Sequence, residues 1–234
     1  MTQMLPLTLT DVSVRKRGKR IIGPVTYTLG QGAPTVVIGP NGSGKTTLLR
    51  VMHGIERINA GQVTWAHDAP DQQAFVFQSP IVLRRTVAEN LAYPLRLAGV
   101  DKAKITTRVT TWMARIGLDA FANTAATRLS GGERQKLAIA RALIRKPQVL
   151  FLDEPCANLD GHTTREIEAL LSETAAAGTR LIMATHDMGQ ARRLAGDVIF
   201  MLNGEIFEHG AASDIMYAPQ TLELKSFLQG DIVT

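Results

Sequence analysis

A chain of 234 residues is long enough to bury a substantial core, either as one α/β domain or as a domain carrying a smaller lobe. Its 45% apolar and 20% charged residues are ordinary for a soluble globular protein, and no apolar run approaches the ~20 residues that span a bilayer. The N-terminus lacks the basic start and apolar core of a secretory signal, and the single cysteine, Cys156, cannot form an internal disulfide. We therefore expect a cytoplasmic protein.

The charge balance is basic, with a net charge of +5 and a pI of about 9.6. Such a charge is compatible with binding to nucleic acid or to an anionic membrane face. The basic residues are scattered, however, and the one cluster, Arg15 to Arg20, has no interleaved aromatic residues for base stacking. We expect no nucleic-acid partner.

The first elements of the chain are predicted to be strands. Apolar and polar residues alternate from Leu7 to Val14 and, more loosely, from Ile21 to Leu29, which predicts antiparallel strands joined through the basic turn. The continuous apolar run Thr35–Ile38 predicts a buried strand, and Leu48–Met52 has helical composition.

Between that strand and that helix lies the sequence GPNGSGKTT, whose Gly39, Gly44, Lys45 and Thr46 satisfy the phosphate-loop pattern G-x-x-x-x-G-K-[ST]. The glycines let successive N–H groups point at an anion, and the helix adds its positive N-terminal end. Lys45 would lie along the β- and γ-phosphates, and the Thr46 hydroxyl would bind Mg²⁺. The predicted triphosphate contacts are Gly39, Pro40, Asn41, Gly42, Ser43, Gly44, Lys45, Thr46 and Thr47.

Two short strands are predicted next, at Gln62–Trp65 and Ala74–Phe77, and Gln78 closes the second. The composition then becomes helical, with a capping box beginning at Thr86 and a helix from Asp101 to Ile116. We expect one domain, with a nucleotide-binding core of residues 1–78 and 136–234 and an inserted helical lobe of residues 79–135.

The rest of the chain alternates strands and helices. A second capping box at Ser130 opens a helix to about Arg145, and four apolar residues, Val149–Leu152, predict a parallel strand covered on both faces. This βαβ succession predicts an α/β fold. The later elements are predicted at Thr163–Ala177 (helix), Arg180–Ala184 (strand), Met188–Leu194 (helix) and Val198–Leu202 (strand), followed by a hairpin-like turn at Gly204 and a short helical tail.

Polar residues at the strand ends are candidates for chemistry. Asp153 and Glu154 follow a predicted parallel strand at its carboxyl end, where open sheets place ligands. Asp153 is suited to hold Mg²⁺, usually through water, and Glu154 to orient or deprotonate the attacking water. His186 follows another strand, which favours a contact with the γ-phosphate.

The stretch LSGGERQ, Leu129 to Gln135, is the most specific signal after the phosphate loop. Ser130 caps a helix, and Gly131 and Gly132 leave its first N–H groups uncovered, so that a phosphate could approach. Because the chain already has one phosphate cradle, a second anion site makes sense if it serves a nucleotide held by another copy.

GPNGSGKT, Gln78, LSGGERQ, VLFLDEP, the run Asn158-Leu159-Asp160 and His186 together resemble the nucleotide-binding subunit of ATP-binding cassette (ABC) transporters. The resemblance covers nearly the whole chain and implies a P-loop NTPase (RecA-like) core with an N-terminal antiparallel β subdomain. It also implies an ATPase that uses ATP and Mg²⁺ in a head-to-tail homodimer. Each ATP would lie between the Lys45 loop of one copy and Ser130–Gly132 of the other.

Roles implied by the resemblance are Glu154 as general base, His186 on the γ-phosphate and Asp160 across the dimer interface. Gln78 would touch Mg²⁺ and the attacking water, and would face the transport partner. The implied partners are integral membrane permease subunits and, indirectly, a periplasmic solute-binding protein. The chain would then be peripheral on the inner face of the cell membrane.

This sequence departs from the family where an aromatic residue usually stacks on adenine, since Arg17 or Lys16 stands there. The planar guanidinium of Arg17 can stack on a base, but selectivity for adenine is in question. The segment Phe77–Leu91 is similar to that of tungstate-type oxyanion importers, which implies import of a small solute such as tungstate or molybdate. A soluble ABC-type ATPase acting on nucleic acid or ribosomes is the alternative, and a P-loop kinase fits less well.

Overall fold

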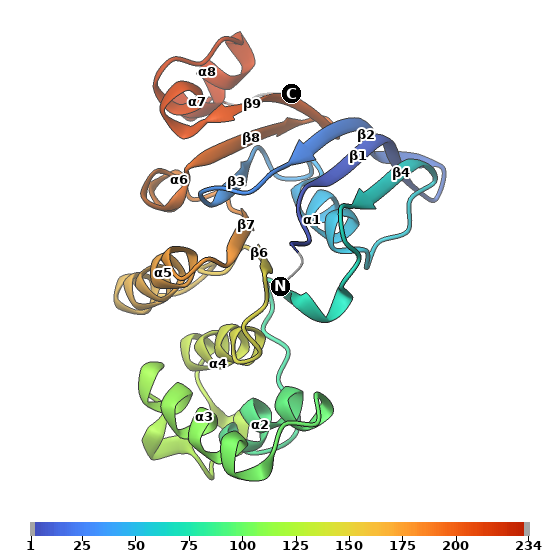
Figure 1. The fold of residues 1–234 in the computed structure, drawn as a ribbon. Coiled ribbons are helices and arrows are strands. Elements are labelled where there is room, and N and C mark those ends of the chain that lie inside the picture. The colour runs from blue at the N-terminus through green and yellow to red at the C-terminus, as the bar shows by residue number, and fades with distance from the viewer. Residues whose placement is uncertain (1–2, 232–234) are drawn as a thin grey trace.

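The computed structural model describes residues 3–231. A three-stranded antiparallel sheet contains most of the N-terminal part, in the order β2-β1-β4 (Figure 1). Its strands are β1 (Leu7–Lys16), β2 (Lys19–Leu29) and β4 (Ala60–Trp65). Between β1 and β2 the chain turns at Arg17 and Gly18, both with positive φ, so the predicted hairpin through the basic cluster is confirmed.

The larger sheet has six strands in the order β5-β6-β7-β3-β8-β9, of which only the edge pair β8–β9 is antiparallel. Every residue of β3, β6 and β7 is buried, as the continuous apolar runs predict for strands covered on both faces. The strands are β3 (Thr35–Ile38), β5 (Gln73–Val76), β6 (Val149–Asp153), β7 (Arg180–Ala184), β8 (Asp197–Leu202) and β9 (Glu205–Ala211).

Helices flank this sheet and form the lobe at the lower end of Figure 1. The lobe contains α2 (Val87–Leu97) and α3 (Lys102–Arg115), whose predicted caps at Thr86 and Asp101 are confirmed. The other helices are α1 (Lys45–His53), α4 (Gly131–Leu143), α5 (Gly161–Ala176), α6 (Met188–Leu194), α7 (Ala212–Tyr217) and α8 (Leu222–Gln229). Single 3₁₀ turns lie at Pro70–Gln72, Asp119–Phe121 and Ala126–Arg128.

Helix α4 connects the lobe to the sheet. It begins after the Ser130 cap, packs against both α2 and β5, and ends at Leu143, two residues before the predicted end. The helix therefore runs without interruption through residues 135 and 136, where we expect the lobe to meet the core. Displacement of the lobe would thus carry the Ser130 end of α4 with it.

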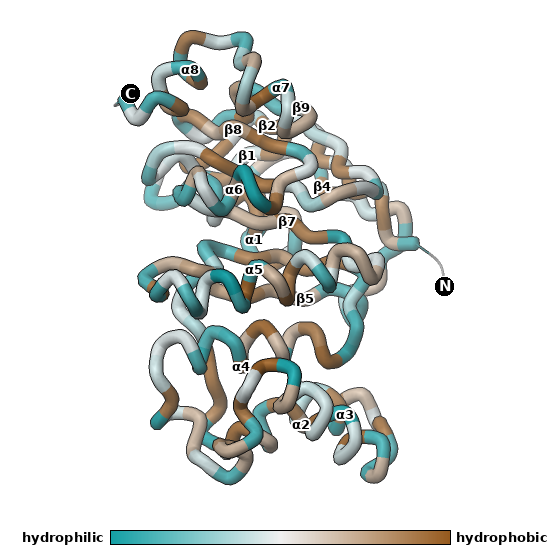
Figure 2. Tube along the Cα trace, turned by 90° about the vertical axis from the view of Figure 1, so that its left-hand side faces the viewer, coloured by the Kyte–Doolittle hydropathy of each residue, from teal (hydrophilic) through white to brown (hydrophobic). Residues whose placement is uncertain are grey.

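The side chains of the large sheet alternate between two hydrophobic clusters, one on each face. Phe151 and Ile182 face the cluster formed with α1 and the N-terminal sheet, whereas Leu150 and Leu181 face the cluster formed with α4, α5 and the lobe. Figure 2 shows the hydrophobic segments concentrated in these inner layers and the hydrophilic ones on outer turns. Within the described residues, no helix combines the length and apolar character needed to cross a bilayer.

Candidate nucleotide-binding site

The phosphate loop connects the end of β3 to the start of α1, and close packing dictates two of its glycines. Gly39 has φ 144°, and a Cβ there would fall far inside van der Waals contact with the carbonyl oxygen of Met201 on β8. Gly44 has φ 101°, and its Cβ would collide with the side chain of Ile22 on β2. The loop is therefore folded tightly between the two sheets, and only glycine fits at these positions.

The start of α1 is open to an anion. Gly44 caps the helix without a side-chain hydrogen bond, and the first turn contains no acidic residue. The Nζ of Lys45 donates to the carbonyl oxygens of Gly39 (2.8 Å) and Pro40 (3.0 Å). Burial lowers the pKa of Lys45, while the carboxylates of Glu154 and Asp153 oppose that shift. Neutral carbonyls thus position the ammonium without cancelling its charge.

Beneath the loop, the Oγ1 of Thr46 donates to the Oδ1 of Asp153 at 2.8 Å. Asp153 is buried, and this burial raises its pKa, whereas the hydrogen bond from Thr46 and the charge of Arg50 lower it. A hydroxyl and a carboxylate in contact are hard oxygen donors of the kind that bind Mg²⁺. These two residues therefore fit the predicted metal.

The next acid along the chain, Glu154, lies beside His186. The Oε2 of Glu154 is 2.8 Å from the His186 Nδ1 and also accepts a hydrogen bond from the His186 backbone N–H at 3.3 Å. Glu154 has φ 49°, in the left-handed region, which turns its side chain out of the line of β6. The ends of β6 and β7 thus bring together two residues that are 32 positions apart.

His186 lies just before α6, and this helix is fixed near both of its ends. The Oδ1 of Asp187 accepts from the Gln190 backbone N–H at 2.9 Å and so caps the helix. Further along α6, Arg193 makes two hydrogen bonds of 2.7 Å to the buried carboxylate of Glu168 on α5. A bidentate pair of this kind fixes helix orientation as well as distance.

A cavity of about 430 Å³ brings most of the predicted site residues together. Its lining includes the phosphate loop, Gln78 after β5, and the Glu154–His186 pair. It also includes Ile21, which sequence reasoning did not single out because one apolar residue at the start of a strand carries no distinctive signal. The lining residues are Ile21, Asn41, Gly42, Gly44, Lys45, Thr46, Thr47, Gln78, Glu154 and His186.

Eight of the predicted site residues lie outside this cavity lining, namely Arg17, Gly39, Pro40, Ser43, Ser130, Gly131, Gly132 and Asp153. Arg17 is exposed at the β1–β2 turn, while Ile21 takes a place on the cavity wall. Ser130 caps α4 through the predicted box, since its Oγ accepts from the Glu133 N–H and its own N–H donates to the Glu133 carboxylate at 2.8 Å. The cap is exposed and is not part of the cavity of the same chain.

The two glycines after Ser130 have different surroundings. A Cβ on Gly131 would meet open space, whereas one on Gly132 would lie 2.9 Å from the Thr163 Cγ2 on α5. Asp160 caps α5 by accepting from the backbone N–H and the hydroxyl of Thr163 and from the backbone N–H of His162, and these bonds lower the pKa of Asp160 to about 2. Packing between two helix starts is thus a second reason for Gly132, which the motif alone did not reveal.

Comparison with known proteins identifies the family to which this chain belongs. The sequence profile described as "ABC transporter" matches residues 22–157. The tungstate uptake system ATP-binding protein TupC of Peptoclostridium acidaminophilum is 35% identical over 87% of this chain and 98% of its own length. The methionine import ATP-binding protein MetN of Cereibacter sphaeroides is 37% identical over 88% of this chain, which spans only 62% of that longer protein.

Solved structures show the same fold. An ATP-binding subunit of an ABC transporter superimposes with a TM-score of 0.84 at 22% identity, covering 96% of this chain and all of the other. The ATP-binding cassette MJ0796, solved as a dimer in a post-hydrolysis state with ADP and phosphate, gives a TM-score of 0.78 at 25% identity over 88% of this chain and 98% of its own. The predicted fold, ATPase class and use of ATP with Mg²⁺ are confirmed at the level of the family. This chain belongs to the ABC transporter family, as one of its ATP-binding domains.

Proposed function

We propose that this chain is the ATP-hydrolysing subunit of an ABC importer and acts as a head-to-tail homodimer. It would dock on permease subunits at the inner face of the cell membrane, and a periplasmic solute-binding protein would deliver the solute. The relatives named for tungstate uptake and for methionine import support the transport role. The open cavity in one chain and the exposed Ser130 cap outside it support the dimer.

The chemistry follows from the residues around the cavity. Lys45 and the N–H groups at the start of α1 would bind the triphosphate of the substrate ATP, while Thr46, Asp153 and Gln78 would hold Mg²⁺. The ion, when bound, offsets the negative charge of the phosphates. Glu154 would accept the proton of the attacking water, and His186 would contact the γ-phosphate from the end of β7.

The main support for this proposal is that the residues expected around one nucleotide lie on two separate surfaces of the chain. The phosphate loop, Gln78, Glu154 and His186 share one cavity, yet the exposed N-terminus of α4 does not line it. A helix start with an open Gly131 is suited to an anion, and a two-fold partner can supply it to the other copy's nucleotide. The dimeric relative with ADP and phosphate is in keeping with this arrangement.

Mixing two inactive variants should restore activity if the site is shared. Lys45→Ala removes the phosphate contact and Ser130→Arg blocks the helix start, so each homodimer is expected to hydrolyse ATP at a small fraction of the wild-type rate. A mixed dimer keeps one intact site, formed by the loop of one chain and the cap of the other. Random pairing should therefore recover about a quarter of wild-type activity, measured as phosphate release.

Two controls make this experiment specific. Thr86→Arg removes a capping box of the same form at α2, where Thr86 does not line the cavity, and should leave hydrolysis intact. A chain carrying both Lys45→Ala and Ser130→Arg should restore nothing when mixed with either single variant. Full activity of the Ser130→Arg homodimer, or no recovery on mixing, would exclude a shared site.

For the solute, we propose a small oxyanion such as tungstate or molybdate. The support is the likeness to the tungstate protein over 98% of that protein's length, together with the segment Phe77–Leu91, which contains Gln78. Cells lacking this chain are expected to lose most high-affinity uptake of tungstate, measured as cell-associated metal, and to regain it with the wild-type chain but not with Lys45→Ala. Unchanged tungstate and molybdate uptake combined with loss of methionine uptake would contradict the oxyanion assignment.

A further inference from the structure

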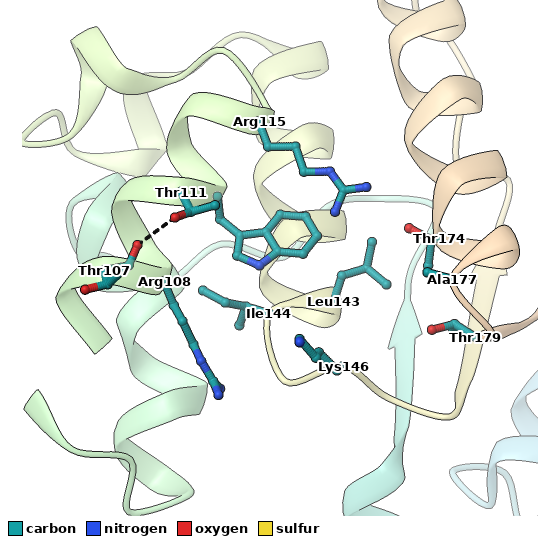
Figure 3. Close-up of a pocket in the computed structure, with 11 residues that line it drawn as sticks. Thr107, Arg108, Thr111, Arg115, Leu143, Ile144, Lys146, Thr174, Ala177 and Thr179 are labelled. Carbon is teal, nitrogen blue, oxygen red and sulfur yellow. Dashed lines mark hydrogen bonds between the residues drawn. The ribbon is translucent and has the colours of Figure 1, made fainter. Parts of the chain in front are cut away.

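A second cavity, of about 440 Å³, lies where α3 of the lobe meets the C-terminal ends of α4 and α5 (Figure 3). It shares no lining residue with the nucleotide cavity, although the two volumes are nearly equal. Pockets of this size commonly hold small organic molecules. The nucleotide chemistry described above makes no use of it.

Cationic side chains from separate elements surround this cavity. Figure 3 shows Arg108 and Arg115 on α3 and Lys146 in the turn after α4, arranged around Leu143 and Ile144. Arg115 is paired with Glu173 at 2.7 Å. Across residues 3–231, neither Arg108 nor Lys146 forms an ion pair, and the lining contains no Asp or Glu. Two positive charges therefore remain available to an anion.

The rest of the lining is largely apolar or already hydrogen-bonded. Trp112 is half-buried beside the buried Leu143 and Ile144, and the Arg115 guanidinium lies 4.9 Å from the Trp112 ring centroid. The hydroxyls of Thr111, Thr174 and Thr179 donate to backbone carbonyls, as drawn for Thr111 in Figure 3. This cavity therefore offers a ligand two positive charges, at Arg108 and Lys146, and contact with the aromatic ring of Trp112.

We propose that this cavity binds a small organic anion with a planar ring. The ring would pack against Trp112 and the neighbouring aliphatic side chains of Leu143 and Ile144. The anionic group would face Arg108 and Lys146. Such a ligand would contact the lobe through α3 and the core through α4 and α5.

Trp112 reports on this site directly. The chain has two tryptophans, so a Trp65→Phe variant leaves Trp112 as the only indole. Phenylacetate, a small aromatic carboxylate, is expected to change its emission saturably, whereas the neutral isostere phenylacetamide should bind at least about ten-fold more weakly. Saturating ADP should leave the phenylacetate titration unchanged, because the two cavities have no residue in common.

Charge-reversal variants in the Trp65→Phe background test whether Arg108 and Lys146 bind the anionic group. Arg108→Glu with Lys146→Glu should weaken phenylacetate binding at least about ten-fold. Lys104→Glu reverses another exposed cation on the same helix, one that does not line the cavity, and should leave phenylacetate binding unchanged. Ala177→Phe, at an exposed position on the rim, fills the cavity without a change of charge and should also abolish binding.

The proposal fails if phenylacetate produces no saturable change, if the acid and the amide bind equally well, or if binding survives both the charge reversal and Ala177→Phe. Since the probe and the readout involve neither ATP nor hydrolysis, these outcomes are independent of the mixed-dimer experiment. Loss of binding in the two cavity variants, with retention in Lys104→Glu, would establish the site.

Discussion

Glu154→Gln is expected to lower ATP turnover by about 10²- to 10⁴-fold while ATP binding persists. The carboxylate is buried at the end of β6, lines the cavity that contains Lys45, and lies 2.8 Å from the His186 Nδ1. The amide keeps the size of the side chain but cannot accept a proton at neutral pH. Steady-state phosphate release and equilibrium binding of ATP separate the two effects, and gel filtration with ATP should show a persistent dimer.

Glu205→Gln is the matched control for this result. Glu205 carries the same charge but is only partly buried on β9, where it pairs with Arg20 at 2.9 Å. A surface pair of this kind contributes little to stability, so the variant should keep wild-type turnover. Rapid hydrolysis by Glu154→Gln would remove Glu154 from its proposed role, whereas an equal loss in both variants would point to a general effect of charge.

Gly39→Ala is expected to destabilise the fold by about 3 kcal/mol or more. The new methyl group would collide with the Met201 carbonyl oxygen and approach the Ser43 Oγ at 2.9 Å, at a φ of 144° that only glycine adopts readily. The strain can be relieved only if β3 moves away from β8, its neighbour in the central sheet. Urea unfolding followed by tryptophan emission measures the change in the free energy of unfolding.

Gly42→Ala separates this collision from the cost of backbone conformation. Gly42 also has a positive φ, 82°, but an added Cβ would meet nothing within 4 Å. This variant should lose only about 1 kcal/mol, the cost of a left-handed conformation for an L-residue. If both variants unfolded at the same urea concentration, close packing of the loop against β8 would not be what requires Gly39.

Local patterns in the sequence predicted most elements, since each depends on neighbours a few positions away. The strand Arg180–Ala184 and the helix Met188–Leu194 occur with the predicted bounds. Strand β9 was missed and interpreted as part of a turn and tail. It lies at the sheet edge, pairs antiparallel with β8, and is only partly buried, so it lacks the continuous apolar run that revealed the central strands.

For the site, the sequence by itself determined the chemical types. A glycine-rich loop with a lysine, acids and a histidine after apolar strands, and a capped helix start with two glycines can all be read from short stretches, because each motif is continuous in the chain. Only the tertiary structure decided which of them meet. Thr46 and Asp153 are 107 positions apart and touch, Glu154 contacts His186, and Gly132 packs on Thr163, while Ile21 joins the cavity wall.

The same reason explains the cavity beside Trp112, whose cations come from α3 and from the turn after α4 and were unremarkable in sequence. Such contacts depend on the order of parallel strands and on how α3, α4 and α5 pack, and these are properties of the whole chain. The types of residue at each site can be read from the local sequence. The distances between those residues, however, are set by the burial of two apolar clusters on opposite faces of one sheet.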